Sequence, residues 1–308
     1  MIKADLITGF LGSGKTTFLK HYVSFLLKRG LKVGIIVNDH GAINVDMLIL
    51  DELNSDKCDT EMVIATDREC HMRRFKTKLI AMYMQGFDRV VVEPSGIFDV
   101  DEFFDIMHDD TIEKMYQTGN VISVVDAGLP EQLSPESEYM LATQVAVAGK
   151  IFVSHMDEYE NELENTVSHL NRSLSLIGIN EDIRERLFAK AYDKCTESDF
   201  ESLCAAEYHP ASYEKRYFEG EGDFDCLFFM NQSYSPEEIR DICGKLFSGD
   251  PYGNVIRVKG FISGSDGKFL AVNATRKKTI MEESAVGQDV IIVIGERLDK
   301  NSIEKIFS

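Results

Sequence analysis

A glycine-rich loop near the start of the chain is the strongest chemical signal in the sequence. Residues 9–16 read GFLGSGKT, the pattern G-x4-G-K-T, between a short apolar run and a stretch of helical periodicity. In such a loop the backbone N–H groups turn inward on phosphates at a helix N-terminus, where the partial positive charge favours anions. Lys15 would reach the β- and γ-phosphates, and the Thr16 hydroxyl would bind Mg²⁺. The sequence therefore predicts a nucleotide site formed by Gly9, Gly12, Ser13, Gly14, Lys15, Thr16 and Thr17.

A carboxylate that could complete this magnesium site follows a second buried strand. Residues 90–92 are three consecutive valines, as expected for a parallel strand that is covered on both faces. Glu93 comes directly after them, at the carboxyl end where open α/β sheets bind ligands. We expect Glu93 to act with Thr16 on Mg²⁺, and Gly96 to let the backbone approach the γ-phosphate.

A third apolar segment, residues 150–157 (KIFVSHMD), is the candidate for base recognition. GTPases carry an N/T-K-x-D arrangement after such a strand, and its carboxylate accepts hydrogen bonds from guanine N1–H and the N2 amine, which adenine cannot donate. Asp157 has the right place, whereas Ser154 and His155 stand where Asn or Thr and Lys would be. The imidazole of His155 could stack on the base in place of the lysine stem. Guanine is the expected base, and an ATP-using variant is the alternative.

Composition narrows the class of protein. The chain has 308 residues, 44% of them hydrophobic, which is enough for one large or two medium domains. Its net charge of −19 disfavours binding to nucleic acid or to anionic membranes. We expect a cytoplasmic protein without a signal peptide or spanning helix, because no run of about 18 apolar residues occurs. The six cysteines form no C-x-x-C pair, which favours reduced thiols.

The order of these motifs resembles that of the CobW-like P-loop GTPases, a family of metal-insertion chaperones and cobalt- or zinc-linked GTPases. The resemblance covers nearly the whole chain. It rests on the segments 9–17 (GFLGSGKTT), 38–46 (NDHGAINVD), 93–96 (EPSG), 124–127 (VVDA), 144–157 (QVAVAGKIFVSHMD), 252–261 (YGNVIRVKGF) and 290–300 (VIIVIGERLDK).

The resemblance implies a GTP hydrolase with slow intrinsic turnover. Residues 38–46 would be a switch segment that senses the γ-phosphate, with Asp39 and Asp46 as candidates for Mg²⁺ contact or water orientation. The alternative for these two is a solvated acidic loop. The catalytic set is then Lys15, Asp39, Asp46 and Glu93. The implied partner is a client metalloenzyme or a corrinoid-dependent protein, and a homodimer is a further expectation.

The segment 65–74 (ATDRECHMRR) lies where the family carries a C-x-C-C metal motif. Only one thiol remains, so the candidate ligands for Zn²⁺ or Co²⁺ are Asp67, Glu69, Cys70 and His71. An arginine-bearing helix start, in which the acids cap the helix or pair with the arginines, is one alternative. A redox or partner-contact role is another. These departures also leave open a nucleotide-gated client-binding module without metal cargo.

The expected fold is a two-domain α/β chain. Residues 1–205 should form a P-loop domain with a parallel sheet and flanking helices, residues 206–222 a linker, and residues 223–308 a smaller, mostly antiparallel α/β domain of CobW type. In the second domain the sequence predicts strands at 226–230, 254–262, 268–274 and 289–295, and helices at 235–247 and 302–307. Ser235 and Pro236 mark a helix N-cap and first helical position.

Overall fold

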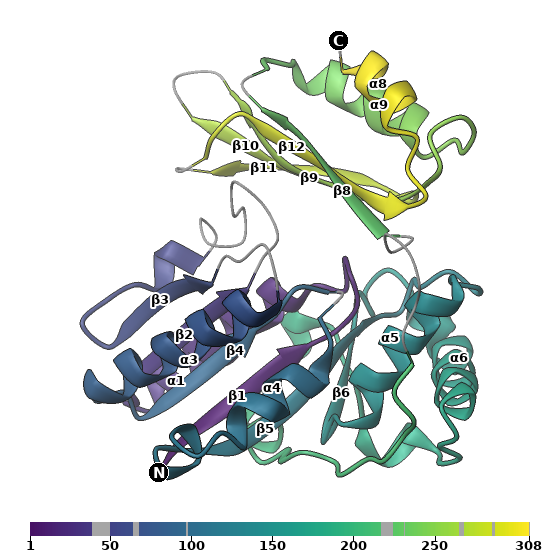
Figure 1. Ribbon diagram of the computed structural model, residues 1–308. Helices are drawn as coiled ribbons and strands as arrows, with labels where there is room; N and C mark the ends of the chain where they lie inside the picture. The colour runs from purple at the N-terminus through teal and green to yellow at the C-terminus, as the bar shows by residue number, and fades with distance from the viewer. Residues whose placement is uncertain are drawn as a thin grey trace. The chain divides into compact units, whose positions relative to one another are not determined.

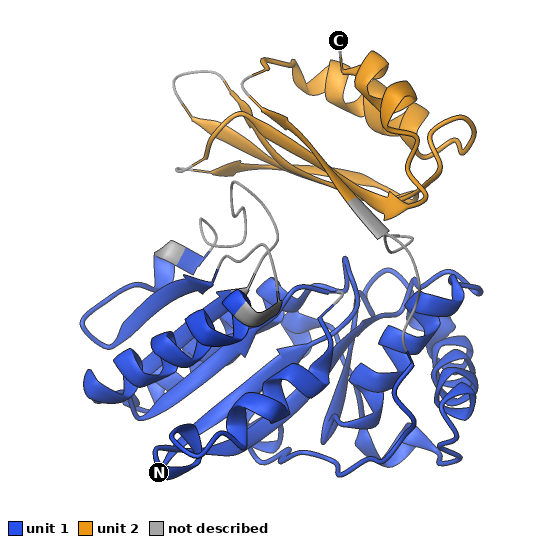
Figure 2. Ribbon diagram, in the orientation of Figure 1, with its two compact units in different colours: residues 1–42, 49–216 blue, residues 43–48, 217–308 orange. Residues whose placement is uncertain are grey.

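The computed structural model describes residues 1–38, 50–63, 68–96, 98–216, 224–230, 232–264, 268–284 and 287–307. The chain divides into two compact units: residues 1–42 with 49–216, and residues 43–48 with 217–308 (Figure 2). Within the described ranges, none of the helices combines the length and the apolar character that a membrane crossing requires.

The first unit is built on a seven-stranded sheet in the order β3-β2-β4-β1-β5-β6-β7, and every neighbouring pair is parallel (Figure 1). This confirms the predicted parallel-sheet P-loop fold. The strands are β1 (Ile2–Thr8), β2 (Val33–Asn38), β3 (Cys58–Val63), β4 (Arg89–Glu93), β5 (Tyr116–Asp126), β6 (Lys150–Ser154) and β7 (Leu187–Ala189). The helices are α1 (Lys15–Lys28), α3 (Arg68–Met84), α4 (Val100–Met107), α5 (Pro135–Ala146), α6 (Leu163–Leu176) and α7 (Glu197–Cys204).

Apolar runs place the strands inside the unit. The valines of β4 and the residues 151–153 of β6 are fully or almost fully buried, as the prediction of two-sided coverage requires. The crossover from β1 to β2 runs along the sheet in the opposite direction to that from β3 to β4. Right-handed crossovers therefore put α1 and α3 on opposite faces. In this arrangement α1 packs against α7, α3 against α4, and α5 against α6.

A buried polar network joins β1, β4 and β5 in the amino-terminal half of the sheet. Asp5 is inaccessible to solvent and lies where the β1–β5 register shifts. Its carboxylate accepts two hydrogen bonds from Arg89, at 2.5 and 2.9 Å, and one from Tyr22 at 2.9 Å. The backbone N–H of Asn120 donates to it as well, at 2.7 Å. The charge of Asp5 is thus both paired and hydrogen bonded, as burial of a carboxylate requires.

Residues 206–216, which the sequence assigns to a linker, are hydrogen bonded to the first unit. Glu207 O accepts from the backbone N–H of Val121, and the N–H of His209 donates to Val147 O at 3.0 Å. Further along, Lys215 forms an ion pair with Asp99 at 2.5 Å. Residues 206–216 therefore lie along the surface of the first unit, which accounts for their polar composition.

The second unit is a five-stranded sheet in the order β11-β10-β9-β12-β8, and all of its neighbouring strands are antiparallel. Its elements are β8 (Phe224–Met230), α8 (Pro236–Leu246), β9 (Asn254–Ser263), β10 (Phe269–Ala274), β11 (Thr279–Ser284), β12 (Val290–Glu296) and α9 (Lys300–Ile306). Both helices cover one face of this sheet, where Ile239 and Ile303 share a core with Val258 and Val293 (Figure 1).

The predicted antiparallel character of the second unit is confirmed, and so is the start of α8. Ser235 caps the helix by accepting from the N–H of Glu238, whose side chain accepts from the N–H of Ser235 in return. The sequence analysis missed β11. This strand lies at the sheet edge and its residues are half-buried or exposed, so it lacks the apolar run that marks its neighbours.

Candidate nucleotide site

The glycine-rich loop joins the carboxyl end of β1 to the first turn of α1. Gly14 has φ +87°, in the left-handed region that favours glycine, and α1 begins at the next residue. Gly9 has φ +145°, and a Cβ on it would lie 2.1 Å from Val124 O of β5. The loop is therefore seated directly on the sheet, and only glycine fits there. The segment has the strand–loop–helix context that the sequence predicts for phosphate binding.

Lys15, the first residue of α1, is hydrogen bonded to the start of the glycine-rich loop. Its ammonium group donates to Gly9 O at 2.9 Å and to Phe10 O at 3.2 Å. The side chain thus lies across the same turn whose N–H groups would receive phosphate oxygens. Inside this turn the Ser13 hydroxyl is buried and has no hydrogen-bond partner among the described residues. Thr17, also assigned to the nucleotide, is exposed on the first turn of α1.

Thr16 and Glu93 are brought together from positions 77 residues apart. The Thr16 hydroxyl donates to Glu93 Oε1 at 2.8 Å. Glu93 ends β4 and is only 3% exposed, while Thr16 is half-buried. A hydroxyl and a carboxylate side by side are hard oxygen donors, the ligand type that Mg²⁺ prefers. The donor set therefore fits a magnesium ion held between α1 and the end of β4.

Gly96 lies against the phosphate loop. A Cβ at this position would be 2.6 Å from the backbone nitrogen of Leu11, so only glycine allows this approach. The carbonyl oxygen of Gly96 accepts from the side-chain amide of Gln144 on α5, at 3.1 Å. The sequence analysis did not single out Gln144, because nothing in its local pattern indicates that α5 reaches this loop.

Residues 155–157, which follow β6, are the candidate base loop, and the end of β6 ties them to the phosphate loop, residues 9–16. The Ser154 hydroxyl donates to Ser13 O at 2.7 Å and is fully buried. His155 comes next with φ +55°, a left-handed conformation that is uncommon for residues other than glycine. Asp157 is exposed, as base recognition by its carboxylate requires. Sequence reasoning treated Ser154 only as a replacement for Asn or Thr and missed its bond to the phosphate loop.

Tyr192 is a second residue that the sequence analysis missed. β7 runs parallel to β6, so the residues after Ala189 lie beside the base loop. The Tyr192 ring stacks on Phe152 and on His21, with centroid distances of 5.0 Å in both cases. Its hydroxyl is 3.5 Å from Gly14 O, and burial raises the pKa of this hydroxyl. Tyr192 therefore supports the helix start from the side of the sheet next to the base loop.

The predicted transition-metal ligands are only partly within the described residues. Asp67 lies outside them, as do the switch residues Asp39 and Asp46, and for Glu69 only the helical backbone is described. Cys70 is half-buried in the first turn of α3. Across the part of the chain that the structure describes, no three His, Cys, Asp or Glu side chains gather closely enough to hold a metal ion.

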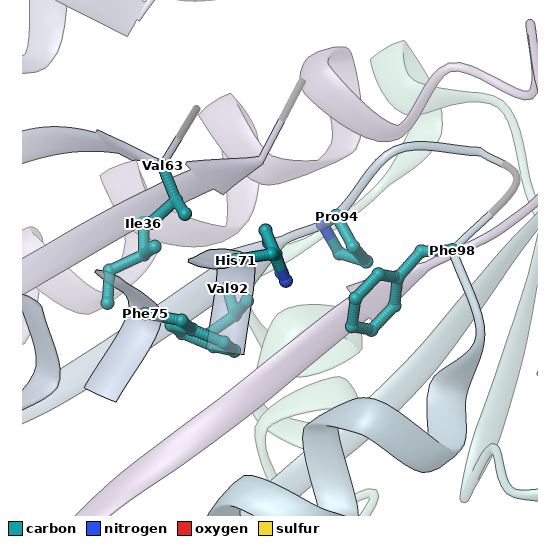
Figure 3. Close-up of a pocket in the computed structure, with 7 residues that line it drawn as sticks. All are labelled: Ile36, Val63, His71, Phe75, Val92, Pro94 and Phe98. Carbon is teal, nitrogen blue, oxygen red and sulfur yellow. The ribbon is translucent and has the colours of Figure 1, made fainter. Parts of the chain in front are cut away.

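His71 lies in an apolar pocket under the start of α3 (Figure 3). Its Nδ1 is 3.5 Å from a carboxylate oxygen of Glu102, and its Nε2 has no hydrogen-bond partner among the described residues. Consecutive residues of a helix point in directions about 100° apart. The side chain of His71 is therefore buried, while that of its neighbour Cys70 is partly exposed. The pocket is lined by Ile36, Val63, His71, Phe75, Val92, Pro94 and Phe98.

A parallel sheet, a phosphate loop and a strand-end carboxylate together define a P-loop nucleotide-binding protein. Residues 3–179 match the family described as CobW/HypB/UreG, nucleotide-binding domain. The match spans more than half of the chain, and the chain belongs to this family.

Similar proteins carry more specific names. Zinc chaperone YjiA of Escherichia coli (strain K12) is 31% identical over 166 residues, which cover 51% of this chain and 50% of YjiA. Zinc-regulated GTPase metalloprotein activator 1 of Dictyostelium discoideum is 24% identical over 216 residues, which cover 57% of this chain and 45% of that protein. The chain thus spans about half the length of the curated relatives it matches.

Two solved structures are similar to this chain along much of its length. Zn(II)-bound YjiA GTPase from E. coli has 17% identity and a TM-score of 0.39, and the match covers 99% of this chain and 98% of that one. Hydrogenase maturation factor HypB from Archaeoglobus fulgidus has 14% identity and a TM-score of 0.43, and the match covers 66% of this chain and 87% of that one.

Proposed function

We propose that this chain hydrolyses GTP and uses its nucleotide state to control maturation of, or metal insertion into, a client metalloenzyme or corrinoid-dependent protein. The observation that carries the proposal is the convergence of Lys15, Thr16 and Glu93 around one phosphate loop in a CobW/HypB/UreG domain. The names of the relatives support the GTPase and metal-chaperone parts of the proposal.

The chemistry of this reaction is mostly positioning and charge stabilisation. A water oxygen attacks the γ-phosphorus, the bond from that phosphorus to the β–γ bridging oxygen breaks, and GDP and phosphate leave. Lys15 binds the β- and γ-phosphate oxygens, and Gly96 donates its backbone N–H near the γ-phosphate. Thr16 and Glu93 would hold Mg²⁺, which supplies positive charge to the phosphates when bound. Asp39 and Asp46 remain the candidates for orienting the water.

Guanine selection is assigned to Asp157, with His155 beside it. The exposed carboxylate of Asp157 suits contact with guanine N1–H and N2. Calorimetry with GDP and ADP on the full chain and on Asp157→Ala tests this assignment. We expect the wild type to prefer GDP and the variant to lose that preference. Equal affinities in the wild type would reject guanine selection and favour the ATP-using alternative.

The metal cargo is the finer part of the proposal. Asp67, Glu69, Cys70 and His71 are the candidate ligands for Zn²⁺ or Co²⁺, and the last three belong to the first turn of α3. His71 can contribute only if its imidazole leaves the apolar pocket, since the ring lies there among apolar side chains and its Nε2 is buried (Figure 3). This cost of rearrangement predicts weak metal binding that depends on nucleotide state.

A second candidate function is a nucleotide-gated client-binding module without metal cargo. The burial of His71 favours it, because a packed histidine is a poor metal ligand. Titration with Zn²⁺ and Co²⁺ in the GDP state and with a non-hydrolysable GTP analogue separates the two candidates. Stoichiometric binding that disappears in Cys70→Ser supports cargo. Absence of such binding in every nucleotide state supports the module.

A further inference from the structure

Two loops at the carboxyl ends of β5 and β6 are fastened to each other beside the phosphate loop. Asp126 and Ser154 are register partners at the ends of these strands. One residue on, the backbone N–H of Ala127 donates to Ser154 O at 3.2 Å. Tyr159 packs against Ala127, and its ring lies so close to Gly128 that a Cβ there would be 2.4 Å away. The β5 loop is thus a fixed support for the base loop.

His155 is held within this support by two side-chain contacts of its Nδ1, one with Ser154 Oγ at 3.3 Å and a shorter one with Asp126. Its Nδ1 is 3.0 Å from Asp126 Oδ1, and both side chains are partly buried, at 31% and 20% exposed. An ionised carboxylate only accepts hydrogen bonds, so Nδ1 carries the donated proton. Asp126 Oδ1 also accepts from the N–H of Gly128 at 2.7 Å, which fixes the carboxylate itself.

The backbone conformation at His155 also helps to orient its side chain. Its φ of +55° is costly for a residue with a Cβ, and such conformations gather at functional sites. Its carbonyl oxygen accepts from the N–H groups of Glu158 and Tyr159, at 3.0 and 3.1 Å. The left-handed turn therefore directs the imidazole toward Asp126 while the following turn carries Asp157.

We propose that Asp126 is a positioning residue for base recognition, which holds the His155 imidazole in one orientation beside Asp157. This inference rests on the proposed binding of a guanine nucleotide. With Nδ1 engaged by Asp126, the proposal assigns the ring face of His155 to contact with the purine. A fixed aromatic ring stacks on a purine without losing rotamer freedom, whereas a lysine stem has to be ordered on binding. The Asp126–His155 pair is how this chain compensates for the missing lysine.

The test is a double-mutant cycle on GDP affinity, measured by calorimetry on the full chain with Mg²⁺. The variants are Asp126→Ala, His155→Ala and the double substitution, with Asp126→Asn as the conservative change and Asp110→Ala as the matched control. Asp110 is an exposed carboxylate before β5, at the opposite end of the strand. Pyrophosphate affinity reports on the phosphate loop, and thermal unfolding reports on the fold.

We expect Asp126→Ala and His155→Ala each to weaken GDP binding about tenfold, with pyrophosphate affinity unchanged. The double variant should bind GDP no worse than His155→Ala, because Asp126 acts through that ring. Asp126→Asn, whose amide oxygen still accepts from Nδ1–H, should recover most of the affinity.

Two results would overturn the proposal: an Asp126→Ala variant with unchanged GDP affinity, or equal further weakening in the His155→Ala background, which indicates a structural role alone. Failure of the proposed function has a different signature, since wild-type protein would then bind GDP no better than ADP.

Discussion

The two ends of the parallel sheet differ in how well their buried polar groups are hydrogen bonded. In the amino-terminal half, Asp5 has hydrogen-bond donors from Arg89, Tyr22 and Asn120. Toward the carboxyl end, several buried polar atoms lack a hydrogen-bond partner within the described residues. They are the hydroxyls of Thr8, Ser13 and Ser123, His71 Nε2 and Gln144 Oε1.

This difference separates groups kept for stability from groups kept for a ligand. A buried polar atom without a hydrogen bond destabilises the ligand-free protein. Its presence therefore points to a partner that is not part of the fold, such as a ligand. The orphaned Ser13 hydroxyl belongs to the phosphate loop, and Gln144 contacts Gly96. Substitutions at the amino-terminal end should therefore lower stability more than nucleotide binding. Substitutions at the carboxyl end should impair nucleotide binding or hydrolysis more than stability.

The largest expected effect is that of Asp5→Ala. It leaves the mostly buried Arg89 guanidinium without its carboxylate, and breaking a buried pair in this way lowers the free energy of unfolding by about 3–5 kcal/mol. Urea unfolding measures the loss, and Asp110→Ala is the control. The folded fraction should bind GDP as the wild type does. A loss below about 1 kcal/mol, typical of exposed pairs, would contradict the contrast between the two ends.

Lys15→Ala should have nearly as large an effect, on catalysis alone. Removing one preorganised positive group from the phosphates lowers the rate of GTP hydrolysis by roughly 100-fold to 1,000-fold. Phosphate release measures the rate, and Lys20→Ala, five residues further along α1, is the matched control. The unfolding free energy should stay within about 0.5 kcal/mol of the wild-type value. A large loss of stability would show that Lys15 serves the fold.

Gly96→Ala should give an intermediate effect. The added Cβ would lie 2.6 Å from Leu11 N, so the phosphate loop or the end of β4 must shift, at about 1–3 kcal/mol. We expect slower GTP hydrolysis at saturating GTP. The control is Gly244→Ala in α8, where a Cβ meets no neighbouring atom. Equal activity of both variants would rule out close contact between Gly96 and the nucleotide site.

The smallest effect is a pH dependence from Glu138, a fully bonded carboxylate on the same helix as Gln144. Burial alone would raise its pKa, but hydrogen bonds from His169 and Ser173 outweigh burial and lower the pKa below the usual 4.5. The unfolded chain then binds this proton more readily. The contribution of Glu138 is therefore complete above about pH 4.5 and declines as the pH falls through its folded pKa.

Unfolding by urea from pH 3 to pH 7 measures this dependence, with Glu138→Gln as comparison. The wild type should lose more stability than the variant over the acidic part of the range. Parallel curves for the two proteins would contradict the assignment.

Sequence predicted those parts of the site that depend on local pattern. The glycine loop has a fixed spacing, and Glu93 follows a valine run, so β1, β4 and their ends were identifiable. Their meeting follows from the common edge of a parallel sheet. The Asp126–His155 contact was not predictable, because register pairing of β5 with β6 and one left-handed residue bring it about.

The same limit applies to His71. A Cys–His pair in sequence suggests two ligands, yet helix geometry turns the imidazole into an apolar pocket. The contacts of residues 206–216 with the first unit were not predictable either, because the partners Val121 and Asp99 are more than 80 residues away in sequence. In both cases long-range packing overrides what the local composition indicates.

The most direct test of the central claim is single-turnover phosphate release by the full chain with Mg²⁺, from GTP and from ATP in parallel. We predict release from GTP, slower release from ATP, and loss of both in Lys15→Ala. No release from GTP, or equal rates from the two nucleotides, would contradict the account.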